Sequence, residues 1–496
     1  MTALVAGLDL GTSSAKLVVV SPDGAVLAEA SEPYATHTAG AGVVEQDAEH
    51  WWRAACAVLG RSGLAADIVA VGITGQMQDL VPVAGGRALR PALLYSDTRA
   101  GEQHRRLVGA VADWERRTGN HQDVTNVAAK LAWLVEHEPD AIRAAEHLLF
   151  SPAGYVAHRA GASAACDVTT ASATGLLDVE ARSWLTDAVV AAGADPRLLP
   201  ALTGASRGDA VVGEVSEVAA RELGLRAGTP LVLAMGDAGA TTAGLVGTEP
   251  GEAYLYLGTT GWLAGITVAG ETEPSPIHSL VLPGWGERLR IGAAQSAGSA
   301  AAWALANLLG ETSFAEAERR VMPRLGHVAE RPLCLPGLAG ERTPVRDGDL
   351  RGAFVGVQEG TTSEDLYLAV LTGVALGLRH AAAEMGISQT RIPLVGGAAR
   401  SGVWRQLLAD VFGAIILTGT ADAPGAHHAA KVAADEIGLP NSLRPVFSTQ
   451  NHRETAPSDV HGRYARLVEV HRGLYDALKP TFHQLAEIRS AAQPRS

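Results

Sequence analysis

A stretch near the start of the chain, VAGLDLGTSSAKLVVV (residues 5–20), combines a strand-like apolar pattern with a carboxylate. Asp9 lies within the first apolar run, and Gly11, Thr12, Ser13 and Ser14 separate it from the second run, 17–20. A carboxylate within an apolar strand is costly unless a partner pairs with it. The stretch therefore predicts two strands joined by a small-residue turn, with a partner for Asp9 close by.

A similar stretch lies in the second half of the chain, YLYLGTTGWLAGITV (residues 254–268). Each stretch has a strand pattern, then Leu-Gly-Thr and a small hydroxyl residue, then a second strand pattern. We interpret this as an internal duplication that opens two related domains. The turn-rich segment 243–250 predicts the boundary, which divides the chain into residues 1–245 and 246–496.

Length, composition and charge narrow the class of protein. A chain of 496 residues is too long for one ordinary core, and 47% hydrophobic with 19% charged residues is a globular composition. The formal net charge of −13 argues against a nucleic-acid or anionic-membrane partner. It does not argue against a phosphate ligand, because phosphate sites use local amide dipoles.

Cysteine usage and the termini indicate the compartment. Cys56, Cys166 and Cys334 are far apart and form no CxxC pair, which is typical of reduced thiols in a cytoplasmic protein. The segment before Asp9 has no basic region of a signal peptide, and we expect no apolar run long enough to span a bilayer.

Short β-branched runs alternate with long Ala/Leu/Arg/Glu stretches, which is the pattern of an α/β protein. Asp47 and Ser363 are expected to cap two of the helices. Strands are predicted at 4–10, 16–20, 68–73, 231–235, 253–257, 291–294, 392–395 and 414–418, and helices at 47–60, 99–111, 128–137, 297–309, 363–386 and 402–412.

The two Gly-Thr turns suggest a phosphate site. Such a turn lets backbone N–H groups approach an anion, and two of them across a cleft would hold a polyphosphate from both sides. Each turn taken alone could equally be an ordinary hairpin. Asp9 favours the phosphate interpretation, since Mg²⁺ is the usual partner of an acidic side chain next to phosphates.

A second carboxylate stands out in LVLAMGDAGATTAG (residues 231–244). Asp237 follows an apolar strand pattern and precedes a run of tiny residues. One interpretation is a helix N-cap. The other is a general base at the end of a strand, with space beside it for a substrate.

Several known catalytic motifs are absent. The four lysines do not complete GxxxxGK[ST], and no strand pattern runs into GxGxxG. The chain also lacks HExxH and any cysteine and histidine spacing typical of zinc sites.

A family resemblance covers nearly the whole chain. The stretches that carry it are GLDLGTSSAK, VEQDAEHWW, GITGQMQDL, CDVTTASATGLLD, GERTPVRDGDLRGAF and VGGAARSGVWRQLLADVFG. With them the chain resembles the FGGY carbohydrate kinases of the actin-like, ribonuclease-H-like ATPase superfamily, and most of all the xylulokinase branch. The resemblance implies a two-lobed α/β fold with a deep interdomain cleft, ATP and Mg²⁺ as cofactors, and a sugar or polyol as acceptor. It leaves a homodimer open.

The resemblance also implies roles for individual residues. Asp237 matches the catalytic base, and Asp9 matches the metal-associated aspartate. The other implied positions are Thr12 and Ser13 in the first phosphate hairpin, Gly258, Thr259 and Thr260 in the second, Gly396, Gly397 and Ala398 in the adenosine loop, and Gln76, Met77 and Gln78 beside Asp237 at the sugar.

Three positions depart from the xylulokinase pattern. Gln78 stands in place of the sugar-binding histidine, Ala238 in place of an asparagine, and Val43 in place of a tryptophan. The resemblance to the xylulokinase branch still makes D-xylulose, phosphorylated to D-xylulose 5-phosphate, the first expectation among ketopentoses. Ribulose, an erythritol-type polyol and a non-catalytic actin-like ATP-binding module are the alternatives. Glycerol kinase fits less well, because its Arg-Glu pair is absent at Met77 and Gln78.

Overall fold

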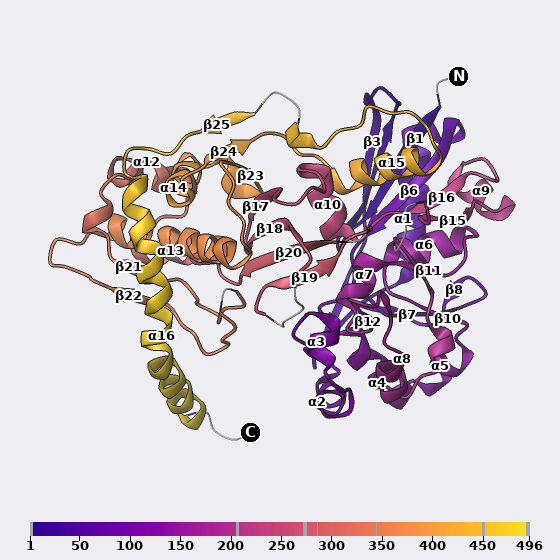
Figure 1. The fold of residues 1–496 in the computed structure, drawn as a ribbon, viewed down its shortest axis with the longest axis horizontal. Coiled ribbons are helices and arrows are strands. Elements are labelled where there is room, and N and C mark those ends of the chain that lie inside the picture. Colours follow the sequence, from indigo (N-terminus) through magenta and orange to yellow (C-terminus); the bar gives the residue numbers. More distant parts are fainter. Residues whose placement is uncertain are drawn as a thin grey trace.

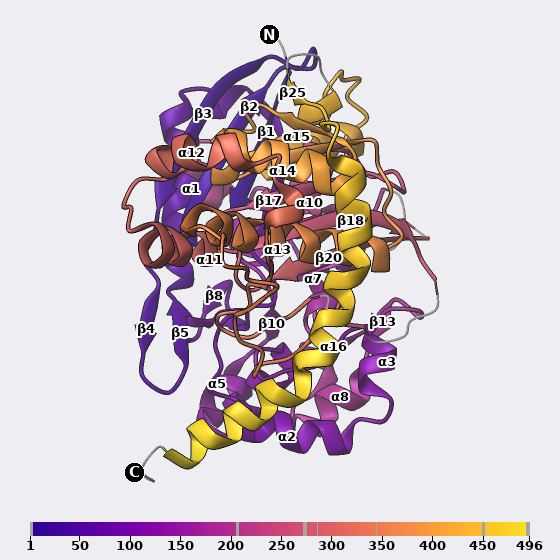
Figure 2. The same ribbon diagram turned by 90° about the vertical axis from the view of Figure 1, so that its left-hand side faces the viewer.

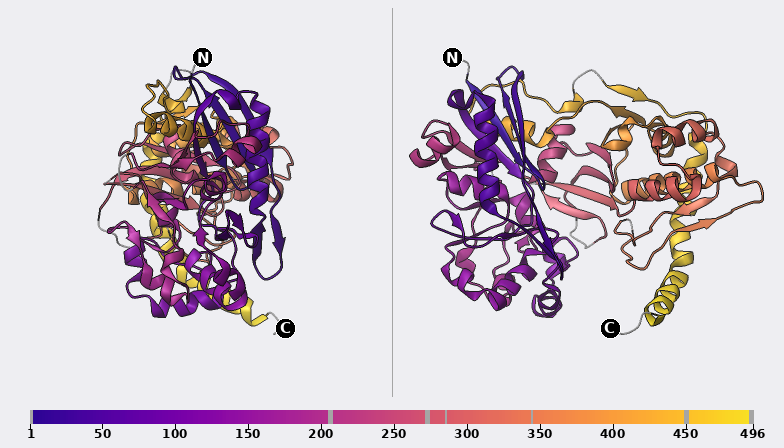
Figure 3. Two further views of the ribbon diagram at one scale, coloured as in Figure 1. Left: turned by 90° about the vertical axis from the view of Figure 1, so that its right-hand side faces the viewer. Right: turned by 180° about the vertical axis from the view of Figure 1, so that it is seen from behind.

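A computed structural model describes residues 3–204, 208–270, 275–284, 286–343, 345–448 and 452–492. The chain forms two lobes, each built around a mixed sheet (Figure 1). The N-lobe holds the indigo and purple first half, and the C-lobe holds most of the orange and yellow second half. The view from behind shows the same division (Figure 3).

The N-lobe sheet has the order β15-β16-β6-β1-β2-β3. Its strands are β1 (Leu4–Leu10), β2 (Ser14–Val20), β3 (Val26–Pro33), β6 (Ile68–Gly75), β15 (Val211–Glu214) and β16 (Pro230–Leu233). The helices of this half are α1 (Ala48–Ser62), α2 (Gly101–Ala110), α3 (Trp114–Thr118), α4 (Val127–His137), α5 (Pro139–Ala144), α6 (Pro152–Ala160), α7 (Val168–Ala173), α8 (Thr186–Ala191), α9 (Glu217–Leu223) and α10 (Asp237–Leu245). Short strands include β5 (Val43–Gln46), β7 (Val81–Ala84), β9 (Ala92–Leu93), β10 (His147–Leu149) and β11 (Ala165–Asp167).

The C-lobe sheet has the order β19-β20-β18-β17-β23-β24-β25. Its strands are β17 (Ala253–Leu257), β18 (Gly261–Val268), β19 (His278–Val281), β20 (Glu287–Ala294), β23 (Arg391–Val395), β24 (Ile415–Thr418) and β25 (Arg453–Thr455). The helices are α11 (Gly298–Ala304), α12 (Phe314–Val321), α13 (Ser363–Glu384), α14 (Gly402–Phe412), α15 (Pro424–Glu436) and α16 (His461–Ala492). Helix α16 runs along the C-lobe and extends beyond it (Figures 2 and 3).

The two sheets repeat one arrangement. β1 pairs antiparallel with β2 and parallel with β6, and β17 pairs antiparallel with β18 and parallel with β23. In each sheet a hairpin at the centre is followed, on its other side, by two further strands, β6 and β16 or β23 and β24. This agrees with the internal duplication and confirms the α/β two-lobed fold expected from the sequence.

One helix connects the two halves of the chain at close range. Helix α15 comes from the second half of the chain but packs on the N-lobe sheet. A Cβ added at Gly7 would lie 1.8 Å from the Ala426 carbonyl oxygen, and one at Gly72 would lie 1.9 Å from that of Ala429. Only glycine permits this approach of a helix to a strand. Packing therefore crosses the proposed boundary at residue 245, and the division into 1–245 and 246–496 stays a prediction.

Two expectations from the sequence need correction. Ser363 is not the cap of its helix, because Thr362 caps α13 and forms a capping box with Asp365, whereas Asp47 caps α1 as expected. The second expectation was that no apolar run is long enough to span a bilayer. Helix α13 is long and apolar enough by length and composition, the one such helix among the described residues. However, 72% of its most apolar stretch is buried, so it serves as the core helix of the C-lobe.

Candidate active site

The edge formed by the carboxyl ends of β1, β6 and β16 brings together three of the predicted site residues. Asp9 is the penultimate residue of β1, Gln76 follows β6, and Asp237 begins α10 after β16. The Gln76 N–H donates to the Leu10 carbonyl (2.9 Å). The Thr74 hydroxyl donates to the Met235 carbonyl (2.7 Å), which ties β6 to the segment before Asp237. Sites in open α/β sheets form at such edges.

Asp237 has the properties of a general base. It is the first residue of α10, and its predicted role as the N-cap is wrong because Gly236 holds that position. Burial, together with the nearby Asp9 charge, raises the pKa of Asp237 from 3.8 to about 7. A carboxylate with a pKa near 7 is suited to accept a proton at neutral pH.

Asp167 supports the turn in front of Asp237. It is buried at the start of α7 and accepts hydrogen bonds from the N–H groups of Thr170 (2.8 Å) and Gly236 (3.0 Å). The CDVTT motif thus fixes the turn that presents Asp237. The sequence did not predict this role of Asp167, because α7 and β16 are far apart in the chain.

The Asp9 side chain fits a cation. Its Oδ1 is buried without a hydrogen-bond partner in the described part of the chain, and burial raises the pKa of the carboxyl group. A Cβ added at Gly425 would lie 2.9 Å from Asp9 Oδ2, so the start of α15 lies against the carboxylate. A free, buried carboxylate oxygen near a second carboxylate is a suitable ligand for Mg²⁺.

The first hairpin is anchored by Gln46 of the VEQD motif. The turn closes through the Gly11 N–H to the Ser14 carbonyl (3.1 Å), and Thr12 and Ser13 are exposed. Gln46 donates to the Thr12 carbonyl (2.7 Å) and accepts from the Gln76 amide (3.1 Å). One side chain therefore links the predicted phosphate hairpin to the predicted sugar loop, a role that the motif alone did not reveal.

The second hairpin and the predicted adenosine loop meet at a cavity of about 640 Å³. Gly258 and Thr259 line it from one side, and Gly397 and Ala398 line it from another. The N–H groups of Gly298 and Ser299 at the start of α11 donate to the carbonyls of Gly258 (3.1 Å) and Thr259 (2.9 Å), which fixes the hairpin beside the cavity. This volume lies within the range of small-molecule sites.

Four predicted nucleotide residues do not line this cavity. Thr12 and Ser13 belong to the first hairpin, in the other lobe, and the other two lie beside the cavity. Thr260 accepts the N–H of Gly258 (2.9 Å) and so closes the turn. Gly396 has a φ of 90°, and a Cβ there would lie 2.5 Å from the Leu257 carbonyl oxygen. Both positions therefore shape the site through the backbone.

The loop 76–79 lies next to Asp237. A Cβ added at Gly236 would lie 2.3 Å from Met77 Sδ, so Met77 packs on the residue before Asp237. Gln78 has a φ of 66° and donates its amide to Asn126 Oδ1 (2.9 Å). Lys130 is buried beneath the loop and donates to the Gln78 carbonyl (2.7 Å). The side-chain oxygen of Gln78, Oε1, accepts no hydrogen bond from the described residues.

Comparison with known proteins gives consistent matches along the chain. Residues 4–244 match the N-terminal domain of the FGGY family of carbohydrate kinases, and residues 253–435 match its C-terminal domain. The chain is 32% identical over 493 residues to the xylulose kinase of Escherichia coli (strain K12), which covers 96% of this chain and 99% of that protein. It is 33% identical over 421 residues to the xylulose kinase of Streptomyces rubiginosus, covering 83% of each.

Solved structures agree with the fold. The crystal structure of xylulose kinase from Rhodospirillum rubrum superposes with a TM-score of 0.85 at 28% identity, covering 97% of this chain and 100% of that one. Gluconate kinase from Lactobacillus acidophilus superposes with a TM-score of 0.84 at 21% identity over 98% of this chain and 100% of that one, which shows a shared fold alone.

Proposed function

The chain belongs to the FGGY family of carbohydrate kinases and is an ATP-dependent sugar kinase, and we propose that its acceptor is the ketopentose D-xylulose. The product would be D-xylulose 5-phosphate, formed at the terminal hydroxyl. The observation that carries the proposal is the convergence of Asp237, Asp9 and the loop 76–79 at one sheet edge. The relatives named xylulose kinase support the choice of acceptor.

Phosphoryl transfer needs positioning and charge stabilisation rather than covalent work by the protein. In the proposed reaction the loop 76–79 holds the sugar, and Asp237 accepts the proton of the attacking hydroxyl. The oxygen of that hydroxyl forms the new bond to the γ-phosphorus as the bond to the β-phosphate oxygen breaks, which releases ADP. The N–H groups of the hairpins at Thr12–Ser13 and Gly258–Thr259 face the phosphates.

We propose that Asp9 holds Mg²⁺, because its free oxygen is buried and lies near Asp237. When bound, Mg²⁺ supplies positive charge that neutralises the triphosphate. Asp9 itself would orient the ion from the end of β1.

A second candidate acceptor is another ketose or a polyol, such as ribulose or an erythritol-type compound. Gln78 favours it, because an amide offers a different hydrogen-bonding pattern from the histidine of the xylulokinase pattern. A non-catalytic ATP-binding module is less well supported, because a pKa near 7 at Asp237 suits proton transfer.

We also propose that the protein works in the cytoplasm. Its three cysteines are free, and Cys166 and Cys334 are buried. Unpaired cysteines are typical of proteins in a reducing compartment.

The test is ADP release from Mg·ATP with a panel of D-xylulose, D-ribulose, L-xylulose, L-ribulose, erythritol and glycerol. We expect the highest kcat/KM with D-xylulose. A higher kcat/KM with another ketose or a polyol would replace the acceptor, and ADP release independent of every acceptor would favour the non-catalytic module.

A further inference from the structure

The side-chain amide of Gln78 is held in one orientation. Its Nε2 donates to the Thr125 carbonyl (3.2 Å) and to Asn126 Oδ1 (2.9 Å). A backbone carbonyl can only accept a hydrogen bond, so the nitrogen of this amide faces Thr125 and its oxygen is the other end. Gln78 is half-buried, whereas Gln76 and Asp79 are buried. Gln78 Oε1 is therefore the acceptor atom that the side chains of this loop offer to a ligand.

Further amides connect Gln78 to the C-lobe. Asn126 donates its Nδ2 to Gln122 Oε1, and Gln122 donates its Nε2 to the Asn120 carbonyl (2.9 Å). Asn120 donates its Nδ2 to the Ser279 carbonyl of β19 (2.7 Å) and accepts the Ser279 N–H (2.8 Å). Asn126, Gln122 and Asn120 are all buried. These three residues and Gln78, here called the amide chain, join the loop 76–79 to an edge strand of the C-lobe sheet.

Every link of the amide chain donates in the same direction, away from the loop 76–79. The backbone sets this direction, because the carbonyls of Thr125, Asn120 and Ser279 can only accept. Turning the Gln78 amide over would place its oxygen against the Thr125 carbonyl oxygen. Hydrogen bonds in such a series polarise one another, so each link strengthens the next. The free end of the series is Gln78 Oε1, and a ligand hydroxyl that donates to it would extend the series by one bond.

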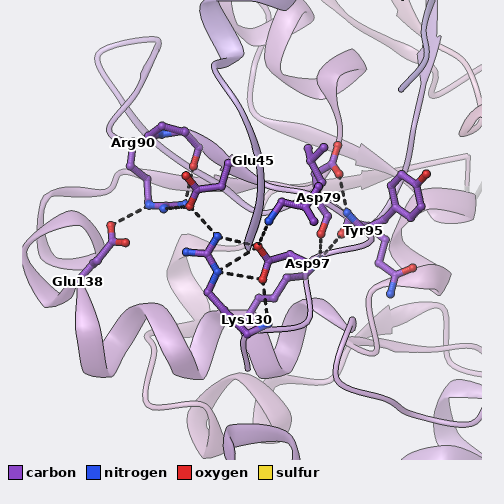
Figure 4. Close-up of polar contacts among 12 residues, drawn as sticks. Glu45, Asp79, Arg90, Tyr95, Asp97, Lys130 and Glu138 are labelled. Carbon is purple, nitrogen blue, oxygen red and sulfur yellow. Dashed lines mark hydrogen bonds and ion pairs between the residues drawn. The ribbon is translucent and has the colours of Figure 1, made fainter. Parts of the chain in front are cut away.

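The main chain of the same loop is held by other contacts. Lys130 is fully buried and donates to the carbonyls of Gln78 (2.7 Å) and Leu94 (2.8 Å). The side chain of Asp79 accepts the Tyr95 N–H (3.1 Å), as Figure 4 shows. These contacts lie within the N-lobe and include no side chain of the amide chain. Loss of a link in the amide chain is therefore expected to release the Gln78 side chain while the backbone of the loop stays in place.

We propose that Asn126, Gln122 and Asn120 are positioning residues, which hold Gln78 Oε1 toward a hydroxyl hydrogen of the acceptor from a fixed point on the C-lobe. The proposal rests on the proposed function of the loop 76–79 as the sugar site. In this arrangement the three residues act on the acceptor only through Gln78. An amide oxygen fixed in this way favours acceptors that place a hydroxyl donor opposite it, because an unmatched polar group in a closed site is costly.

The test is a double-mutant cycle between Asn126→Ala and Gln78→Ala, with the acceptor of highest kcat/KM in the panel, which we expect to be D-xylulose. In the wild-type background Asn126→Ala should raise the KM for this acceptor about fivefold or more, with the KM for ATP changed less than about twofold. In the Gln78→Ala background the same substitution should change the acceptor KM less than about twofold, because no oriented amide remains. An equal rise in both backgrounds, or no rise in the wild-type background, would overturn the proposal.

Asn120→Ala probes the far end of the amide chain, and we expect it to raise the acceptor KM about twofold to fivefold. Thr169→Val is the matched control. Thr169 also crosses to β19, through its hydroxyl to the Val281 carbonyl (2.7 Å), but takes no part in the amide chain. The control should keep the wild-type KM for the acceptor. An unchanged KM in Asn120→Ala, or the same rise in Thr169→Val, would overturn the connection to the C-lobe.

If Asn126→Ala melts well below the wild type, Asn120→Asp takes its place in the cycle. The aspartate still accepts the Ser279 N–H but has no donor for the Ser279 carbonyl. A rise in acceptor KM that disappears in the Gln78→Ala background supports the proposal, and a rise that persists there overturns it. If the wild type releases no ADP with any sugar or polyol, the proposed function falls, and the role of the amide chain falls with it. A wild type that phosphorylates a sugar while the cycle shows no coupling loses only the positioning role.

Discussion

Replacing Asp237 by asparagine should greatly lower turnover and stabilise the protein at the same time. The wild-type carboxylate is ionised at a cost, because burial and the charge of Asp9 oppose its negative form. Asparagine has nearly the same shape and no charge. We therefore expect turnover to fall about 10²-fold or more, the range for a lost general base. The melting temperature should rise.

The size of the stabilisation follows from the pKa of Asp237. Its value is raised from 3.8 to about 7 in the folded protein, which corresponds to about 4 kcal/mol. The folded state binds this proton more tightly than the unfolded state, so the wild type loses stability as pH rises from about 4 through about 7. The advantage of Asp237→Asn should be about 2 kcal/mol at pH 5 and about 4 kcal/mol at pH 8. For 496 residues unfolding together, 4 kcal/mol is about 4 °C.

Differential scanning calorimetry at pH 5 and pH 8, without ligands, measures this difference. Asp47→Asn is the control, since Asp47 is exposed at the cap of α1 and asparagine caps a helix equally well. The control should melt with the wild type at both pH values. A variant at Asp237 that melts at or below the wild type at pH 8 would refute the argument that this carboxylate is held ionised against its surroundings.

Four further predictions concern other parts of the site and fold. Asp9→Ala should raise the Mg²⁺ concentration needed for half-maximal activity far more than it raises the KM for the sugar, and an unchanged Mg²⁺ titration would remove Asp9 from the metal site. Gln78→His should change the ratio of kcat/KM for D-xylulose and D-ribulose about tenfold to a hundredfold, because mismatched buried polar groups cost about 1–3 kcal/mol; an unchanged order of substrates means that Gln78 is not the selector. Gly72→Ala should lower stability by about 1–3 kcal/mol in denaturant unfolding, since its Cβ would lie 1.9 Å from the Ala429 carbonyl, and a wild-type midpoint would contradict that packing. Small-angle scattering should show a smaller radius of gyration with an ATP analogue and sugar together, because the two hairpins lie on different lobes; no change at saturation counts against closure.

Local patterns in the sequence were sufficient for the central elements of the fold. The apolar run at residues 4–10 is β1 with the same bounds, and the repeated Gly-Thr turns are the two central hairpins. These features are local, since strand periodicity and turn chemistry involve neighbouring residues. The helix cap at Thr362 was missed by one residue because Ser363 is also a good cap residue, and only the hydrogen bonds with Asp365 decide between them.

The candidate site was predictable where a motif carries the chemistry. Asp9, Asp237 and the loop 76–79 do meet at one sheet edge, and Gly397 and Ala398 reach the same cavity as Gly258 and Thr259. The supporting residues were not predictable, because their contacts join distant segments. Gln46 links two loops, Asp167 holds the turn before Asp237, and Lys130 lies buried under Gln78. Each of these residue types is more often found on a surface or at a helix cap, so no local pattern assigned them to the site.

The most direct test of the proposed function is ³¹P nuclear magnetic resonance of the purified protein with Mg·ATP and D-xylulose. We predict the loss of the ATP resonances, the growth of those of ADP, and one new phosphomonoester resonance in equal amount that depends on D-xylulose. Asp237→Asn should give almost none of this product in the same time. ADP together with inorganic phosphate, at a rate independent of D-xylulose and of every other sugar or polyol, would contradict sugar phosphorylation by this site.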